Sequence, residues 1–222
     1  MSGRRRLQLA GLAIMCAGLV AVATGGADLG YGLWRQQQVT GEWQREMGGP
    51  PAAVGGPVSP APPVPRAGGP GTAGRTAGGA AGSRPAGGRS SAAVFALWIP
   101  RLGYYAAVRQ GVDAGVLAGG PGHYPTTAWP GQPGIVGVAG HNTFWIAFDR
   151  LEVGDEIVLQ TRTGSYGYRV TGTRIVSADD RSLFPASDRH LLTLTTCWPL
   201  WAGALAPRRL AILATQTTPA PG

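Results

Sequence analysis

The chain has 222 residues, enough for one domain of ordinary size with additional segments at its ends. Its 37 glycines and 19 prolines make up about a quarter of the sequence, a level typical of chains that contain low-complexity sequence. The net charge of +8 comes from arginine alone, yet residues 92–215 hold ten arginines against eight acidic residues. The basic excess therefore lies in the N-terminal third, which argues against a basic nucleic-acid-binding groove on the folded part.

The first predicted element is an apolar run at residues 7–27, which follows a basic N-terminus of residues 1–6. About 20 apolar residues in a helix span the hydrocarbon core of a bilayer, and arginines before such a run keep that end in the cytoplasm. We therefore predict a single-pass signal anchor in the cell membrane, with the rest of the chain extracellular. A cleaved signal peptide is the alternative, since Ala21-Val22-Ala23 resembles a cleavage site. Both interpretations export the domain.

Two segments of different composition follow the apolar run. Residues 28–47 are polar and contain good helix formers, which predicts a juxtamembrane helical stalk. Residues 48–92 consist almost only of Gly, Pro, Ala, Ser and Thr with four arginines, and they hold too few large apolar side chains to build a core. We predict a disordered linker there that has no binding role of its own.

Residues 93–215 are predicted to form the globular domain, and residues 216–222 a disordered tail. Short apolar or alternating runs, separated by Gly and Pro turns, predict about eight strands with little helix. The predicted strands are residues 94–100, 104–108, 134–140, 156–161, 166–170, 173–177, 191–196 and 210–215. This spacing of strands and turns is typical of an all-β barrel or sandwich.

The two cysteines are predicted to be unable to form a disulfide. Cys16 falls in the apolar run, whereas Cys197 follows the strand predicted at 191–196. An exported protein seldom keeps an unpaired thiol unless the thiol is used, so Cys197 is a candidate nucleophile. The alternative is a buried, inert cysteine that packs as a small apolar residue.

A thiol nucleophile needs a partner that takes up and returns its proton. His141 directly follows the buried strand predicted at 134–140, so the backbone places it at a strand end, and imidazole suits this proton exchange. Arg208 and Arg209 open the last predicted strand. An arginine can stabilise the oxyanion that forms when a carbonyl is attacked. Cys197, His141 and one of these arginines are therefore predicted to meet at one site.

The other two histidines are weaker candidates. His123 lies in a predicted loop and could line a substrate groove, whereas His190 lies in a turn and is predicted to be solvated. Three isolated histidines and one usable cysteine do not have the spacing of metal ligands, so we predict no metal.

Residues from about 97 to 215 resemble the sortases, the membrane-anchored cysteine transpeptidases of Gram-positive bacteria. The resemblance is carried by five groups of residues: IPRLG at 99–103; GPGHYP, PGQPG and AGHNT between 120 and 143; GDEI at 154–157 with the Tyr166/Tyr168 hairpin; LTTC at 194–197; and RLAI at 209–212. It implies a closed sortase-type β-barrel of about eight strands with short helices. The resemblance is closest to the class D and class E groups, through Trp198-Pro199 and the short link to the arginine.

The resemblance also implies a role for each candidate residue. Cys197 would attack a carbonyl of a sorting-signal peptide of LPXTG type and form a thioacyl-enzyme. His141 would protonate the leaving amine and later deprotonate the incoming amine of a peptidoglycan precursor or a pilin. Arg209 would bind the substrate backbone and the oxyanion. Arg208 remains the alternative, because adjacent strand residues face opposite ways.

The remaining expectations concern substrate contacts and bound groups. Thr196 and His123 are predicted to line the substrate groove. Asn142 stands where many members of the class D and E groups carry an arginine. We predict no cofactor and no nucleic-acid partner.

Two other kinds of protein compete with this interpretation. In papain-like and NlpC/P60-like peptidases the cysteine precedes the histidine, whereas here His141 precedes Cys197. L,D-transpeptidases carry their cysteine in an S-H-G-C type segment, which this chain lacks. A non-catalytic cell-wall-binding module on a tether is the other alternative, and it predicts an unreactive thiol at Cys197.

Overall fold

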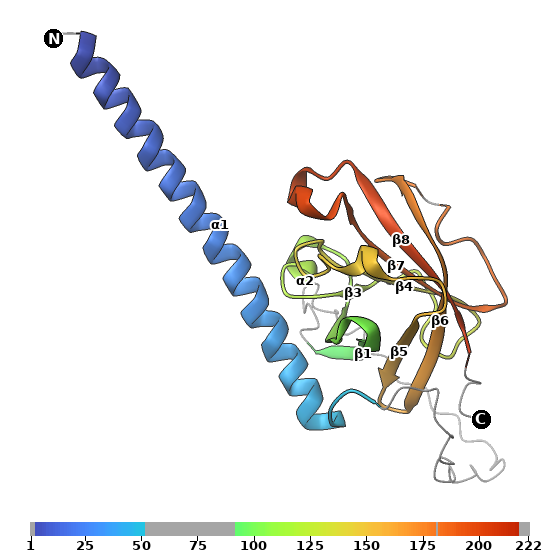
Figure 1. The fold of residues 1–222 in the computed structure, drawn as a ribbon. Coiled ribbons are helices and arrows are strands. Elements are labelled where there is room, and N and C mark those ends of the chain that lie inside the picture. The colour runs from blue at the N-terminus through green and yellow to red at the C-terminus, as the bar shows by residue number, and fades with distance from the viewer. Residues whose placement is uncertain (1–2, 52–91, 181, 218–222) are drawn as a thin grey trace, which may run out of the picture.

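The computed structural model describes residues 3–51, 92–180 and 182–217. In the N-terminal part of the first range it describes only some of the side chains. One long helix precedes eight strands and several short helices (Figure 1). The helices are α1 (Gly3–Met47), α2 (Ala114–Leu117) and the 3-10 turns η1 (Pro100–Leu102), η2 (Phe148–Arg150) and η3 (Leu200–Leu205). The strands are β1 (Ala93–Ile99), β2 (Tyr104–Gln110), β3 (Gly122–His123), β4 (Gly134–Ala139), β5 (Glu156–Thr161), β6 (Gly164–Ser177), β7 (His190–Trp198) and β8 (Arg208–Gln216).

The strands close into one barrel in the order β1-β2-β3-β4-β7-β8-β6-β5, which confirms the predicted closed β-barrel. Pairs β2–β3 and β4–β7 are parallel and the other six are antiparallel. Full closure leaves no unpaired sheet edge. The barrel interior is filled by aromatic and branched aliphatic side chains, among them Phe95, Leu97, Ile157, Leu194 and Ile212.

Two of the predicted strands differ from those in the structure. Residues 166–170 and 173–177 are parts of the single strand β6, which pairs with β8 on both sides of a register shift between Val170 and Gly172. A glycine at such a shift looks like a turn in the sequence, although the chain only bulges there. The two-residue strand β3 escaped prediction because it is too short to show a periodic pattern.

Strand alternation sorts the side chains of β7 and β8 onto two faces. Leu192 and Leu194 point into the barrel core together with Leu210 and Ile212. The residues between them on β7, including Thr193 and Thr195, therefore point outward. The outer face of these two strands carries the site described below.

Helix α1 runs without interruption through the predicted anchor (7–27) and the predicted stalk (28–47). Many side chains of residues 7–27 lie outside the described residues. Among the residues that the structure describes, no helix is both long enough and apolar enough to cross a membrane. The predicted linker lies mostly outside the described residues, at 52–91, as does the end of the predicted tail, at 218–222.

The C-terminal part of α1 packs against the outside of the barrel on β1 and β2 (Figure 1). Trp43 is 1% exposed and forms a small core with Val39, Ala96 and Ala107. Its indole N–H donates a hydrogen bond to Gln160 Oε1 at 3.2 Å. Small alanine side chains on the barrel let the helix approach closely enough to bury the indole.

Three polar contacts accompany this apolar core. The Ala107 N–H donates to Thr40 Oγ1 at 3.1 Å. Arg162 forms a salt bridge with Glu46 at 2.6 Å and lies over the Trp43 ring, 4.8 Å from its centroid. The helix end is therefore held by specific geometry as well as by apolar burial.

Replacing Trp43 by alanine should lower the free energy of unfolding by about 3 kcal/mol, because a buried indole and its hydrogen bond are lost. Trp34→Ala is the control, since Trp34 on the same helix is 53% exposed and its loss should change stability by about 0.5 kcal/mol or less. Chemical denaturation of the full chain in detergent, followed by circular dichroism, measures both. Equal effects would contradict the docking of α1.

Candidate active site

Cys197 and Arg209 occupy directly opposed positions on β7 and β8. The antiparallel register pairs Cys197 with Arg209 and Trp198 with Arg208. Cross-strand partners project on the same face of a sheet. Arg209 therefore shares the face of the thiol, and Arg208 belongs to the opposite face, so the register favours Arg209 as the thiol's partner.

His141 reaches the same rim from β4. Strands β4 and β7 are parallel, with Ala139 opposite Thr195, and the Gly140 N–H donates to Thr195 O at 3.1 Å. Two residues further along each chain come His141 and Cys197. The positive charge of Arg209 acts on the pKa of His141, which places the imidazole near the guanidinium at this rim.

The three groups lie half-buried at the rim, so each remains accessible to a substrate. Burial lowers the pKa of His141 below its ordinary value, and the positive charge of Arg209 lowers the pKa further. Both effects disfavour the protonated imidazole. His141 is therefore neutral at pH 7 and able to accept a proton from a thiol.

Asn142, the residue after His141, connects two segments of the rim by a hydrogen bond. It is 1% exposed, and its Nδ2 donates to the carbonyl of Gly203 at 3.2 Å. Gly203 lies in η3, which follows Cys197, so this bond links the segment after the histidine to the segment after the cysteine. Sequence reasoning noted Asn142 only as a departure from the related groups and missed this contact.

The outer face of β7 and β8 is hollowed beside Arg209. A cavity of about 420 Å³ is bordered by Arg209, Thr195 and Tyr124, and by the β6–β7 connection with Asp179 and Asp180. The Tyr124 hydroxyl and Thr195 Oγ1 lie 2.9 Å apart in a hydrogen bond. Period-two alternation back from Cys197 could have identified Thr195, whereas Tyr124 comes from a distant loop that no local pattern connects to this face.

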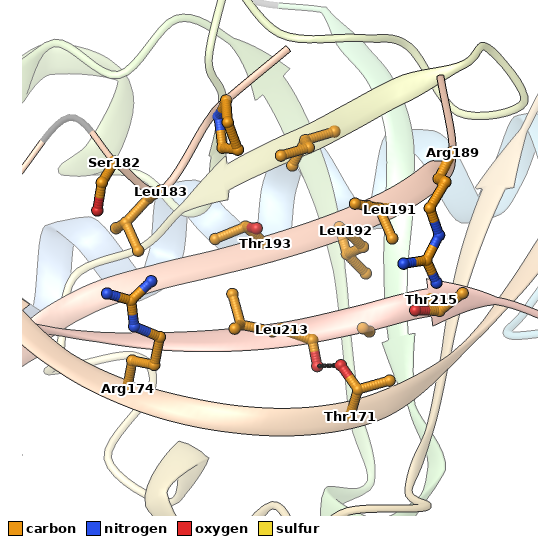
Figure 2. A pocket seen from close by; sticks show the side chains of 13 residues that line it. Thr171, Arg174, Ser182, Leu183, Arg189, Leu191, Leu192, Thr193, Leu213 and Thr215 are labelled. Carbon is orange, nitrogen blue, oxygen red and sulfur yellow. Dashed lines mark hydrogen bonds between the residues drawn. The ribbon is translucent and has the colours of Figure 1, made fainter. Parts of the chain in front are cut away.

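A second cavity, of about 340 Å³, continues along the same strands away from Cys197. Figure 2 shows Thr193 and Leu213 at its floor, with Arg174 and Arg189 on opposite sides. Leu183 borders both cavities. The outer face of β7 and β8 is thus hollowed and partly apolar along a stretch that ends at Arg209.

Thr196 does not border either cavity. It is 2% exposed on the inner side of β7, where its hydroxyl oxygen finds no hydrogen-bond partner. The structure therefore does not place Thr196 beside these cavities, because adjacent strand residues face opposite ways. Thr195 is the threonine that faces outward.

His123 lies in β3 rather than in a groove-lining loop. Its ring is 0% exposed, with Nδ1 3.0 Å from Gln110 Oε1 and Nε2 3.0 Å from the Ala128 carbonyl oxygen. The ring packs edge-on against Phe95 of the core. The structure does not bring His123 to the rim, and its contacts are those of a structural core residue. His190 begins β7, at the strand end opposite to Cys197.

The last feature of the site concerns side chains that could bind a metal ion. Within the described ranges, no three His, Cys, Asp or Glu side chains are grouped as metal ligands would be.

Comparison with known proteins agrees with this architecture. The sequence model of the sortase domain matches residues 97–217, so the chain belongs to the sortase family. Among curated relatives, Sortase D of Bacillus subtilis (strain 168) is 32% identical over 124 residues, which cover 55% of this chain and 63% of the relative. The match thus spans less than two thirds of that protein's length.

Two solved structures give the same picture. The Sortase D5 transpeptidase of Clostridium perfringens has a TM-score of 0.53 at 25% identity, with 58% of this chain and 81% of that chain covered. A mutant sortase E from Streptomyces avermitilis has a TM-score of 0.50 at 30% identity, with 57% of this chain and 88% of that chain covered.

Replacing Arg209 by glutamine should raise the pKa of His141, because a nearby positive charge is removed. The pKa should stay below its ordinary value, since the burial of the ring remains. Arg208→Gln is the matched control and should leave the His141 pKa unchanged. Titration of the His141 ring by NMR measures both, and an equal rise in the two variants would contradict the strand register.

The buried ring of His123 should make the protein less stable in mild acid. Burial lowers the His123 pKa below its ordinary value of 6.5, so below this pH the unfolded chain binds a proton that the folded protein resists. The free energy of unfolding should therefore fall as pH drops below about 6.5. His123→Gln should flatten this dependence, with the contribution of His141 remaining. An unchanged slope in denaturation curves between pH 5 and 7.5 would refute the assignment.

Proposed function

We propose that this protein is a cysteine transpeptidase that cleaves a sorting-signal peptide of LPXTG type and transfers the acyl part to an amine. The observation that carries the proposal is the pairing of Cys197 with Arg209 across β7 and β8, with His141 at the matching position after β4. This arrangement puts a thiol, a neutral imidazole and a permanent cation at one accessible rim. It is a suitable set of groups for acyl transfer.

The first half-reaction forms the thioacyl-enzyme. His141 accepts the thiol proton as the Cys197 sulfur attacks the peptide carbonyl, and Arg209 stabilises the negative charge that develops on the carbonyl oxygen. The resulting imidazolium donates its proton to the leaving amine when the C–N bond breaks. The charge of Arg209 disfavours the imidazolium, which makes it a stronger acid for this step.

The second half-reaction runs in the opposite sense. An incoming amine loses a proton to His141 and attacks the thioester carbonyl, again beside Arg209. Collapse of the intermediate forms a new amide and releases the sulfur, which regains a proton from His141. The acceptor is the amine of a peptidoglycan precursor or of a pilin.

The peptide is proposed to lie along the hollowed outer face of β7 and β8. Leu183 and Leu213 there provide apolar contact, and Thr195 and Tyr124 provide polar contact close to Arg209. The cavity volumes of about 340 and 420 Å³ suit a short extended peptide in the size range of small-ligand sites.

The proposed location is the outer side of a bacterial cell membrane, with residues 7–27 as the anchor. The support is the sequence itself, namely the apolar run preceded by arginines. Export of this kind would bring the active site to its wall or pilin acceptor and to substrates that leave the cell.

Cys197→Ala and His141→Ala should each reduce transfer by at least about a thousandfold, because residues that act together in covalent catalysis cannot replace one another. The full chain is incubated with a panel of sorting-signal peptides and an amine, and mass spectrometry identifies the cleaved bond and the product. Arg208→Ala and Cys16→Ala are the controls and should retain activity.

The alternative function, a non-catalytic wall-binding module, predicts a different result. The wild-type chain would then form no thioacyl adduct, and Cys197 would resist alkylation. That outcome would refute the proposed transpeptidase.

A further inference from the structure

Helix α1 contacts the segment that carries His141, in addition to its contacts with the barrel wall. We call residues 140–147, between β4 and η2, the histidine loop. Gly32 of α1 is buried, and a Cβ atom built on it would lie 3.1 Å from the Phe144 ring and 2.6 Å from the Ala118 carbonyl oxygen. A side chain at this position would therefore clash with the backbone that follows α2 and press on the Phe144 ring, so the helix would have to shift away from both.

A second contact runs through hydrogen bonds. Gln36, one helical turn after Gly32, donates from Nε2 to the Tyr104 hydroxyl at 3.3 Å. The same hydroxyl accepts from the indole N–H of Trp145 at 2.9 Å. Residues four apart lie on one face of a helix. Gly32 therefore lies next to the histidine loop directly, and Gln36 is connected to it through Tyr104 of β2.

Trp145 in turn organises the backbone around His141. The backbone N–H groups of Trp145 and Phe144 both donate hydrogen bonds to the His141 carbonyl oxygen, at 3.1 and 3.0 Å. The Trp145 indole is 0% exposed, is stacked on Phe148 at 4.2 Å, and lies so close to Gly140 that a Cβ there would be 2.5 Å away. A shift of Trp145 must therefore move the backbone on both sides of His141.

The Tyr104 hydroxyl is the hydrogen-bond acceptor that connects Gln36 of α1 with Trp145 of the histidine loop. Burial raises the Tyr104 pKa, so the phenol stays neutral and keeps its place as a hydrogen-bond partner. Among the described residues, the Tyr104 hydroxyl is the acceptor that the buried Trp145 indole N–H has. A buried donor without an acceptor is costly, so Trp145 follows the position of Tyr104.

From these contacts we propose that the docked part of α1, residues 32–47, is a positioning element of the active site. Trp43, Thr40 and the Glu46–Arg162 pair fix the helix on the barrel. Gly32 and Gln36 then hold the histidine loop through Phe144, Tyr104 and Trp145. The predicted effect of these residues on turnover rests on the proposed function. Their predicted effect on the position of the histidine loop does not.

Gly32→Ala and Gly30→Ala form a matched pair for the test. Both replace a glycine of α1 by the best helix former, but only position 32 has atoms in the way, since nothing lies within 4 Å of a Cβ at position 30. Gly32→Ala should lower kcat about tenfold or more with KM changed less than about twofold, because small misplacements of a reacting group are costly. Gly30→Ala should match the wild type in both.

A second readout does not depend on turnover. If the histidine loop loosens, water reaches His141 and its pKa should rise toward the ordinary value in Gly32→Ala, but not in Gly30→Ala. NMR titration of the full chain in detergent measures this pKa. If the wild type transfers no acyl group, the proposed function fails, whereas the pKa difference between the two variants still decides the positioning role.

Tyr104→Phe keeps the aromatic ring and removes the hydroxyl that accepts hydrogen bonds from Gln36 and Trp145. This variant tests the positioning role of α1 if Gly32→Ala fails to fold. It should lower kcat about fivefold to tenfold and raise the His141 pKa, since a buried hydrogen bond near the loop is lost. Equal kcat and equal His141 pKa in the wild type and in these folded variants would overturn the proposal.

Discussion

The register of strand β7 between its two neighbours determines whether the three reactive groups can meet. Parallel pairing with β4 brings His141 level with Cys197, and antiparallel pairing with β8 puts Arg209 opposite the thiol. The buried side chains Leu192 and Leu194 lock this register, because a slip by one residue would turn them outward and the thiol inward. The apolar core therefore determines which side chains of β7 and β8 share the outer face with Cys197.

The second consequence of this register is electrostatic. Burial of the ring and, after it, the fixed positive charge of Arg209 lower the pKa of His141, which keeps the ring neutral at rest and makes its protonated form a stronger acid. Arg209 projects on the same face as Cys197, and its charge also acts on the imidazole. The position of Arg209 follows from the antiparallel pairing of β7 with β8, whereas His141 arrives from the side of β4.

The sequence was sufficient for the barrel, which follows from apolar alternation, turn residues and the ordered motifs of a known family. The catalytic roles of Cys197, His141 and Arg209 stay predictions, for which the strand register provides a consistent geometry. The sequence was insufficient wherever a side chain's direction or a distant partner decides. Thr196 was assigned to a groove although it lies on the inner side of β7, and His123 was assigned to a groove although it packs in the core. Tyr124 meets Thr195 from 71 positions away, which no local pattern reveals.

Helix α1 illustrates the same limit on a larger scale. Its docking residues, such as Val39 and Trp43, are too sparse to form a recognisable apolar stripe, and the matching surface of Ala96 and Ala107 looks like ordinary strand sequence. Only the fold shows that these small residues leave room for an indole. The matched family segment begins at residue 97, so it omits the helix altogether. Yet α1 covers one wall of the barrel and lies against Phe144 of the histidine loop, so the packing around this loop extends beyond the segment that the family model matches.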